Sequence, residues 1–382
     1  MKFVQCTALC AIVAMAFFAV SSQADDKIPV RVVVVTTFQG GNDNDPTAGE
    51  FGNWVLNLPL PLTIPFPQGY HHLRYNPELQ VLGIVAGEGK SHAAASIMGL
   101  GMDPRFDLSK AYWIVAAIAG IDPNKGSVAS TAWAKFVVDG DLSYQIDARE
   151  ISPSWSTGYV PLGRSSPCEG PSQPFNSNGV QQVYQLNASL VDWAFQSTKH
   201  THLPDDSTLL QVRAGYPTYP NALKPPFVLE GDELAADTFW FGDLLNAWAE
   251  NWTSYWTVAQ GSFATSAFED AGVGQALQFL SQAGRADQNR LLVLRAASDY
   301  TVQPQGQTPA QFLASENSGG LSGFQEALND VYKVGSIVVK KTQFQLGHLR
   351  ESKSLAGLPC QRRPLLRETD RRQRASPRLG PS

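Results

Sequence analysis

The segment Leu291-Leu-Val-Leu-Arg-Ala-Ala-Ser-Asp299 decides the fold. It is an apolar run of strand length that ends in two charged positions, Arg295 and Asp299. Such runs are typical of parallel strands that are buried on both faces of an α/β sheet. Ligands bind these sheets beyond the carboxyl ends of the strands, so the segment predicts a carboxylate delivered to a binding site. The alternative is that Asp299 only caps the turn that follows.

Other apolar, β-branched runs predict further strands of the same sheet, and segments rich in small residues between them predict helices packed on it. We expect strands within residues 28–37, 81–85, 111–117 and 127–138, helices over residues 187–198, 237–255, 270–283 and 323–337, and a short strand with a Pro-rich turn over residues 208–219. The strand–helix–strand order predicts a three-layer α/β/α domain with a mainly parallel central sheet.

The amino-terminal residues resemble a targeting signal rather than part of the domain. Lys2 is followed by an apolar run over residues 9–20 and by the small residues of Ser22-Gln-Ala24, which is the pattern of a secretory signal peptide. No later run reaches 18 consecutive apolar residues. We therefore expect residues 1–24 to be removed, residues 25–339 to form a single domain, and the protein to be exported to the periplasm or the extracellular space.

The carboxyl-terminal residues differ from the rest of the chain in charge. Residues 340–382 carry eleven Lys and Arg against three Asp and Glu, and they show no apolar period. This composition predicts a disordered basic tail, with a basic arm for anionic surfaces as the alternative. The formal charge of the whole chain is −5, which gives no electrostatic reason to expect nucleic acid as a partner.

Cysteine usage favours neither a metal site nor a dense disulfide framework. Cys6 and Cys10 lie in the predicted signal peptide, so only Cys168 and Cys360 remain. The sequence leaves open whether these two form a disulfide. No CxxC motif or Cys/His spacing is present. We expect no metal and no tightly held cofactor.

Two glycine-containing turns are candidate ligand loops. Gly40 and Gly41 follow the first predicted strand, and glycine allows a backbone to approach a ligand closely, although the neighbouring Asn and Asp residues are also ordinary turn formers. The second turn precedes a helix that we expect Ser91 to open, and it contains Lys90. It lacks the complete GxGxxG pattern, so it does not predict a dinucleotide site.

Four segments, in this order, resemble the purine nucleoside phosphorylases and related nucleosidases. They are residues 83–94 (GIVAGEGKSHAA), residues 117–142 with AIAGIDP and DGDL, residues 268–273 (FEDAGV) and residues 295–299 (RAASD). Three further segments, TTFQGGND from Thr36, AGEFGNW from Ala48 and AREI from Ala148, resemble the purine nucleoside permease family over roughly residues 28–340. The resemblance implies the fold predicted above and a purine nucleoside as the ligand.

The resemblance also implies roles for individual residues. Glu269 would accept hydrogen bonds from the ribose hydroxyls, and Phe268, Ala119 and Gly120 would contact the nucleoside. Asp299, with a raised pKa, would protonate purine N7 and make the base a better leaving group. Glu50 would activate the attacking water, unless it is simply a solvated loop residue.

Two positions depart from the phosphorolytic pattern. Val115 and Ile118 stand where phosphorolytic relatives have Arg and Ser, and an apolar pair cannot hold a phosphate dianion. Phosphate as a co-substrate would then need an anion site made by Gly40, Gly41, Lys90 or Arg295.

Three functions remain open from the sequence. The chain could cleave the N-glycosidic bond of a purine nucleoside, by hydrolysis or phosphorolysis. It could instead bind the nucleoside without turnover and deliver it to a separate membrane carrier. A direct permease is the third hypothesis. A homo-oligomer is compatible with all three.

Overall fold

The computed structural model describes residues 27–167 and 181–356. The predicted signal peptide, Cys168, Cys360 and residues 357–382 lie outside the described residues. Helix α8 (Phe324–Ala356) continues past residue 339, where the domain was expected to end. In the part of the chain that is described, no helix combines the length and apolarity needed to cross a membrane.

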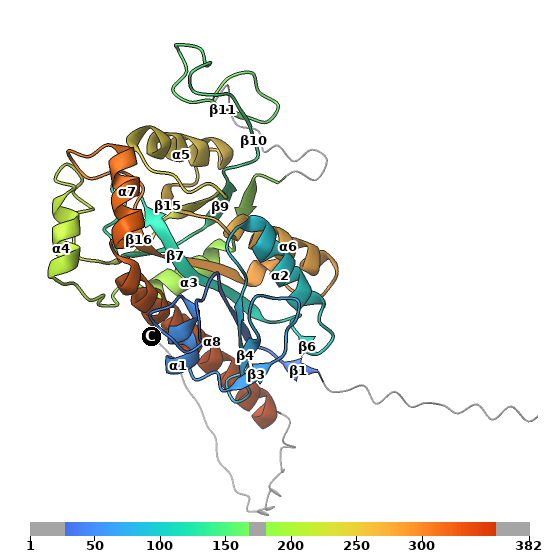
Figure 1. The fold of residues 1–382 in the computed structure, drawn as a ribbon. Coiled ribbons are helices and arrows are strands. Elements are labelled where there is room, and N and C mark those ends of the chain that lie inside the picture. Colours follow the sequence, from blue (N-terminus) through green and yellow to red (C-terminus); the bar gives the residue numbers. More distant parts are fainter. Residues whose placement is uncertain (1–26, 168–180, 357–382) are drawn as a thin grey trace, which may run out of the picture.

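A 12-stranded sheet runs through the molecule (Figure 1). Its centre consists of four strands that are parallel to one another, β5 (Val81–Val85), β2 (Val32–Thr36), β7 (Tyr112–Ile121) and β16 (Leu291–Tyr300). A second parallel group, β9 (Phe136–Asp139), β14 (Asp232–Ala235) and β15 (Phe263–Ala267), joins β7 through an antiparallel pairing of β15.

Shorter strands complete the margins. The sheet also contains β3 (Leu62–Ile64), β4 (Leu73–Asn76), β8 (Thr131–Trp133), β12 (Val183–Gln185) and β13 (Val228–Glu230). Two small separate sheets pair β1 (Ile28–Pro29) with β6 (Phe106–Asp107), and β10 (Ser143–Gln145) with β11 (Tyr159–Pro161). The β10–β11 pair projects from the body at the top of Figure 1.

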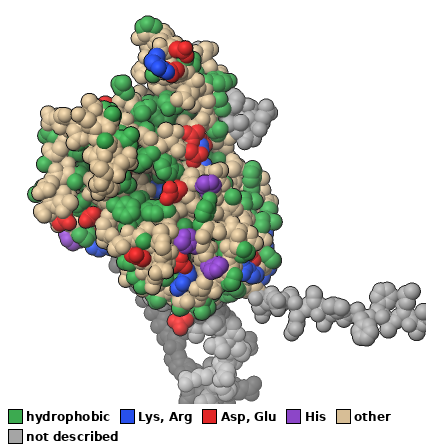
Figure 2. All heavy atoms as spheres, viewed as in Figure 1, with side chains coloured by type: hydrophobic (Ala, Val, Ile, Leu, Met, Phe, Trp, Pro, Cys, Tyr) green, Lys and Arg blue, Asp and Glu red, His purple; other side chains and the backbone are tan. Residues whose placement is uncertain are grey.

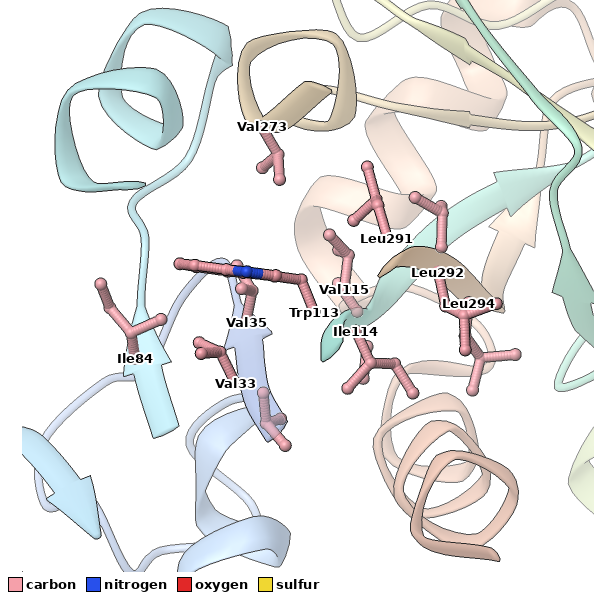
Figure 3. Close-up of a cluster of buried hydrophobic side chains, with 14 of the residues drawn as sticks. Val33, Val35, Ile84, Trp113, Ile114, Val115, Val273, Leu291, Leu292 and Leu294 are labelled. Atoms are coloured by element: carbon pink, nitrogen blue, oxygen red, sulfur yellow. The ribbon is translucent and has the colours of Figure 1, made fainter. Parts of the chain in front are cut away.

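Helices cover both faces of the sheet, so the predicted three-layer α/β/α fold is confirmed. Helices α2 (Lys90–Met102) and α6 (Asp270–Gln282) pack against each other on one face. Helix α8 packs on β7 and β16 from the other face, where it also contacts α1 (Phe51–Asn57) and α3 (Ala188–Thr198). Figure 3 shows this arrangement, with Val273 of α6 on one side of the strands and the turns of α8 on the other.

The first halves of β7 and β16 form the centre of the apolar core. Their parallel register sets Leu291 beside Trp113 and Val293 beside Val115. These four side chains are at most 3% exposed, and Figure 3 shows three of them among the other buried residues of neighbouring strands. Burying such side chains contributes about 1.5–3 kcal/mol each. The predicted central strand at Leu291 is therefore confirmed, together with its burial on both faces.

Three further helices complete the chain, and one of them corrects a sequence-based prediction. They are α4 (Ser207–Ala214), α5 (Asp243–Trp256) and α7 (Pro309–Gly319), with a short 3₁₀ helix at Gln288–Arg290. The strand expected within residues 208–219 is wrong. Asp206 caps helix α4 there by accepting hydrogen bonds from the amides of Thr208 and Leu209, and this cap outweighs the β-branched residues that suggested a strand.

Three element boundaries also differ from expectation. Helix α2 starts one residue earlier than predicted, after Gly89 rather than at Ser91. Helix α5 starts only after Gly242, whose φ of 130° is outside the helical range, so residues 237–242 form a loop instead of its first turn. Strand β7 continues to Ile121, four residues beyond the predicted end. Because β7 is longer than expected, Ala119 and Gly120 belong to the strand itself.

Candidate functional site

A pocket of about 310 Å³ lies at the carboxyl ends of β2, β7, β15 and β16. Figure 2 shows a hollow on this side of the molecule, with hydrophobic side chains gathered around it and acidic side chains beside it. Seven of the ten predicted site residues line the pocket: Glu50, Ala119, Gly120, Phe268, Glu269, Arg295 and Asp299. Residues from segments far apart in the chain therefore meet at the sheet edge where the sequence predicted a site.

Asp299 owes its position to an irregularity in β16. The pairing of β16 with β7 shifts register between Ala297 and Asp299, so Ser298 is the extra residue of a β-bulge. The bulge allows Ser298 and Asp299, although adjacent, both to line the pocket. The Ser298 hydroxyl donates a hydrogen bond of 2.8 Å to Asp299 Oδ1, whereas Oδ2 is buried without a partner among the described residues. An ideal Cβ on Gly120 would lie 3.3 Å from this Oδ2, so glycine keeps the space beside it open.

Burial raises the pKa of Asp299 to about 7, against the lowering effect of the Ser298 hydroxyl. The carboxylate of Glu316, which belongs to α7, raises the pKa further. Asp299 therefore carries a proton over much of the range in which an ordinary aspartate is ionised.

Glu50, which lines the pocket, joins β2 to β7. One carboxylate oxygen accepts hydrogen bonds from the amide and the hydroxyl of Thr37, the residue that follows β2, at 2.6 and 2.9 Å. The other accepts from the amide of Ile118 in β7 at 2.7 Å. Burial raises the pKa of Glu50 to about 7, although the charge of Arg295 and these amides act in the opposite direction. The expectation of a solvated loop residue is wrong, because Glu50 is fully buried.

Glu269 is held by one donor on each carboxylate oxygen. Arg295 donates to Oε2 at 2.8 Å, and the amide of Gly89, at the start of α2, donates to Oε1 at 3.2 Å. The side chain is buried, and burial raises its pKa while Arg295 lowers it. The lone pairs that remain on its two oxygens are available for hydroxyl donors in the pocket.

Arg295 is already neutralised by protein carboxylates and is not a free anion site. Its guanidinium donates to Asp270 at 2.9 Å and to the carbonyl of Ile118 at 2.8 Å, besides Glu269, and lies 3.3 Å from Glu233. The side chain is 2% exposed. One buried cation thus faces three carboxylates, so the protein already compensates its charge.

The sequence analysis missed Asp270 and Glu233, the two other carboxylates that contact Arg295. Both are fully buried. Burial and the neighbouring charge of Asp270 raise the pKa of Glu233 well above its ordinary value. Asp270 directly follows Glu269 and could have been singled out with it. Glu233 gives no local signal, because it lies in an ordinary-looking strand 62 residues away from Arg295 in the chain.

An aromatic wall on one side of the pocket was also missed. Phe239, in the loop before α5, lies edge-on to Phe268 with ring centroids 5.8 Å apart. Phe239 is 48% exposed, so much of its ring is open to a ligand. Phe38 and Phe324, which are far apart in the chain, also line the pocket, and their ring centroids are 6.0 Å apart. The only hint in the sequence was the density of aromatic residues around position 240.

Gly40, Gly41 and Lys90 of the predicted ligand loops do not line the pocket, whereas Glu88 of the second loop does. Gly40 and Gly41 belong to a turn in which the Gly40 amide donates to the carbonyl of Ala48. The ammonium of Lys90 is bound by Asp139 and Asp141, each at 2.9 Å. Burial alone would lower the pKa of Lys90, but these carboxylates outweigh it and raise the pKa. Within the described residues, no group of three or more His, Cys, Asp or Glu is placed to hold a metal ion.

Comparison with known proteins places this geometry in a family. A Candida albicans purine nucleoside permease is 28% identical over 282 residues, which cover 72% of this chain and 67% of that protein. A Schizosaccharomyces pombe protein described as a probable purine nucleoside permease is 31% identical over 239 residues, or 60% of this chain and 67% of that protein. Among solved structures, a Neisseria meningitidis 5′-methylthioadenosine/S-adenosylhomocysteine nucleosidase is similar with a TM-score of 0.48 and 13% identity, covering 81% of this chain and 99% of that chain.

The family match extends over nearly all of the described domain. The profile of the family described as purine nucleoside permease (NUP) matches residues 29–343. This range contains every residue of the pocket. The chain belongs to the purine nucleoside permease family.

Proposed function

We propose that this chain binds purine nucleosides in the pocket and cleaves their N-glycosidic bond by hydrolysis. The observation that carries the proposal is Asp299, whose Oδ2 is buried and unpartnered in a pocket that also contains Glu50 and Glu269. A group with a pKa near 7 that can give up a proton inside a pocket is suited to general acid catalysis.

The three carboxyl groups divide the reaction between them. Glu269 accepts hydrogen bonds from the ribose hydroxyls, and the protonated Asp299 donates to purine N7. As the bond between C1′ and N9 breaks, its electron pair moves into the base and the Asp299 proton transfers to N7. A water oxygen bonds to C1′ and its proton passes to Glu50. Proton exchange between solvent and both groups then restores the starting state.

The charge of the pocket favours water over phosphate as the nucleophile. The described lining contains four acidic side chains, Glu50, Glu88, Glu269 and Asp299, and a single basic one, Arg295. Since Arg295 is already occupied by protein carboxylates, a phosphate dianion would enter without a counter-charge. Ile118 adds an apolar side chain to the wall, and Val115 lies in the core without lining the pocket.

An assay of base release tests the proposal. The purified protein is incubated with adenosine or inosine, with and without phosphate, and free base and free ribose are quantified. We expect base and ribose in equal amounts and no dependence on phosphate. Release of ribose 1-phosphate that depends strictly on phosphate would show that phosphate, and not water, is the nucleophile. Glu50→Gln is the matched variant, since it keeps the shape of the side chain but cannot take a proton from water.

A second candidate function is binding without turnover, with delivery of the nucleoside to a separate membrane carrier after export. The observation that favours it is the hydrogen bonding of Glu50, which accepts from Thr37 and Ile118 and thereby joins two strand ends. That is a structural task, and it leaves fewer lone pairs for a water molecule. Calorimetry that shows tight adenosine binding, combined with no free base after hours, would select this function over hydrolysis.

A further inference from the structure

The turn between β5 and α2 contacts the acidic centre of the pocket through its backbone. Gly89 has a φ of 95°, which favours glycine, and its amide donates to Glu269 Oε1 at 3.2 Å. Helix α6, which follows Glu269, lies directly against this turn, since a Cβ on Gly272 would collide with the carbonyl oxygen of Lys90. The position of Gly89 therefore determines how one oxygen of Glu269 is held.

Lys90 ties this turn to two strand ends on the other side of the pocket. Its ammonium contacts both carboxylate oxygens of Asp139, at the end of β9, and one of Asp141, all at 2.9 Å. Its amide donates to Asp237 Oδ1, after β14, at 2.7 Å. The Asp237 amide in turn donates to Asp141 at 2.7 Å. These contacts form a closed network around one cation.

The burial of this network makes it stiff. The Lys90 and Asp139 side chains are only 15% and 7% exposed, so solvent screens their ion pair less than an ordinary surface pair. Asp139 is itself held by the amides of Asp141 and Leu142. Because its three ammonium protons have carboxylate partners, Lys90 has no donor left for a ligand.

We infer that Lys90 is a positioning residue. It holds the Gly89 amide against Glu269 and thereby determines how strongly Glu269 binds the ribose hydroxyls. The inference rests on the proposed function, in which Glu269 binds those hydroxyls. Lys90 does not line the pocket, and the hydrogen bond from the Gly89 amide to Glu269 links its turn to the ligand-binding carboxylate. Removing the ammonium releases the turn and leaves one oxygen of the buried Glu269 without its donor.

The test measures binding of two ligands that differ only in the hydroxyls. Adenosine and 2′,3′-dideoxyadenosine are titrated by calorimetry into the wild-type protein and into Lys90→Met. We expect the substitution to weaken adenosine binding about tenfold, the worth of one hydrogen bond to a charged group. The affinity for dideoxyadenosine should change by less than about twofold, since that ligand has no hydroxyls for Glu269 to hold. A purely structural role of Lys90 would weaken both ligands equally, and that result would overturn the inference.

Two further variants protect the test from trivial outcomes. Lys110→Met removes an exposed lysine near the opposite end of β7 and should leave both affinities unchanged. Asp141→Asn removes one partner of Lys90 at a half-exposed position and should reproduce the selective loss for adenosine at smaller size, even if Lys90→Met does not fold. If the wild-type protein binds neither ligand, the proposed function fails; if it binds adenosine and both network variants bind it equally well, only the role of Lys90 fails.

Discussion

The two halves of β16 are equally buried but do opposite things. Leu291 to Leu294 pack against apolar neighbours, and every atom they bury stabilises the fold. Arg295 to Asp299 bury a guanidinium, a hydroxyl and a carboxyl group, which burial alone destabilises. The guanidinium is compensated by three carboxylates, whereas Asp299 Oδ2 has no partner among the described residues. The second half therefore costs stability that the first half offsets, and the proposed function would explain why this cost is kept.

The sharpest test of this contrast is Asp299→Asn. Asparagine keeps the size of the side chain but cannot give up a proton, so we expect base release to fall by about 10²- to 10⁴-fold. Steady-state kinetics with adenosine measures the loss, and calorimetry should still detect binding. Unchanged turnover would remove Asp299 from the reaction and leave its burial without a functional reason.

Arg295→Met separates compensation from function. The change leaves Glu269, Asp270 and Glu233 together in the interior without their cation, so we expect the free energy of unfolding to drop by about 3–5 kcal/mol. Chemical denaturation measures it. Arg149→Met is the control, because Arg149 is 88% exposed and its loss should not change stability. If Arg295→Met were as stable as the wild-type protein, the three acids would have to be neutral through protonation, and their ion pairs with Arg295 would contribute nothing to stability.

Leu294→Ala tests the other half of the strand. Leu294 is fully buried, and truncation of such a residue costs about 2–5 kcal/mol of stability through lost transfer energy and the cavity left behind. Nucleoside affinity, measured well below the melting temperature, should stay at the wild-type value. A variant that keeps its stability but loses affinity would show that the two halves are not separate. Leu244→Ala serves as the comparison. Leu244 is 75% exposed, so this change should alter neither the stability nor the nucleoside affinity.

The buried carboxyl groups of the pocket also make the stability of the protein depend on pH. The pKa values of Glu50 and Asp299 are raised from 4.5 and 3.8 to about 7 in the folded protein. The folded state therefore holds protons that the unfolded chain has already lost. Their stabilising contribution is complete below the unfolded pKa values and is lost as pH rises through about 7. Each group adds a slope of at most about 1.4 kcal/mol per pH unit.

Thermal unfolding measured between about pH 5 and pH 8 checks this direction. We expect the melting temperature to fall as pH rises. Asp299→Asn should reduce this fall, because asparagine does not titrate. The melting temperature of the variant should compare most favourably with that of the wild-type protein at the alkaline end of the range. A melting temperature that rises over this interval in the wild-type protein, with the same course in the variant, would contradict the raised pKa of Asp299.

Much of the fold could be predicted from local sequence. The runs at Val81–Val85 and Leu291–Tyr300 are strands because long apolar, β-branched segments can be buried on both faces of a sheet. Where prediction failed, one residue outweighed the average of its window. Asp206 caps α4 and converts an expected strand into a helix, and Gly242 delays the start of α5. A single hydrogen bond or a single positive φ is not visible in the composition of a segment.

The candidate site could be predicted only in part, for a related reason. Asp299 and Glu269 stand at element ends that the sequence locates, and the order of the segments already indicated a nucleoside site. The partners of these residues are distant in the chain. Ile118 lies 68 positions from Glu50, Gly89 lies 180 positions from Glu269, and Phe239 enters from a loop that was expected to be helix.

The amino-acid sequence by itself determined which strands are buried and which acidic residues follow them, since both depend on the apolar pattern of short segments. Only the tertiary structure decided what those acids meet. It converted Lys90 and Arg295 from expected anion-binding groups into cations held by the protein's own carboxylates. It also used a one-residue bulge to turn Asp299 into the pocket. Charge pairing and register depend on contacts between distant segments, and those contacts exist only once the sheet has formed.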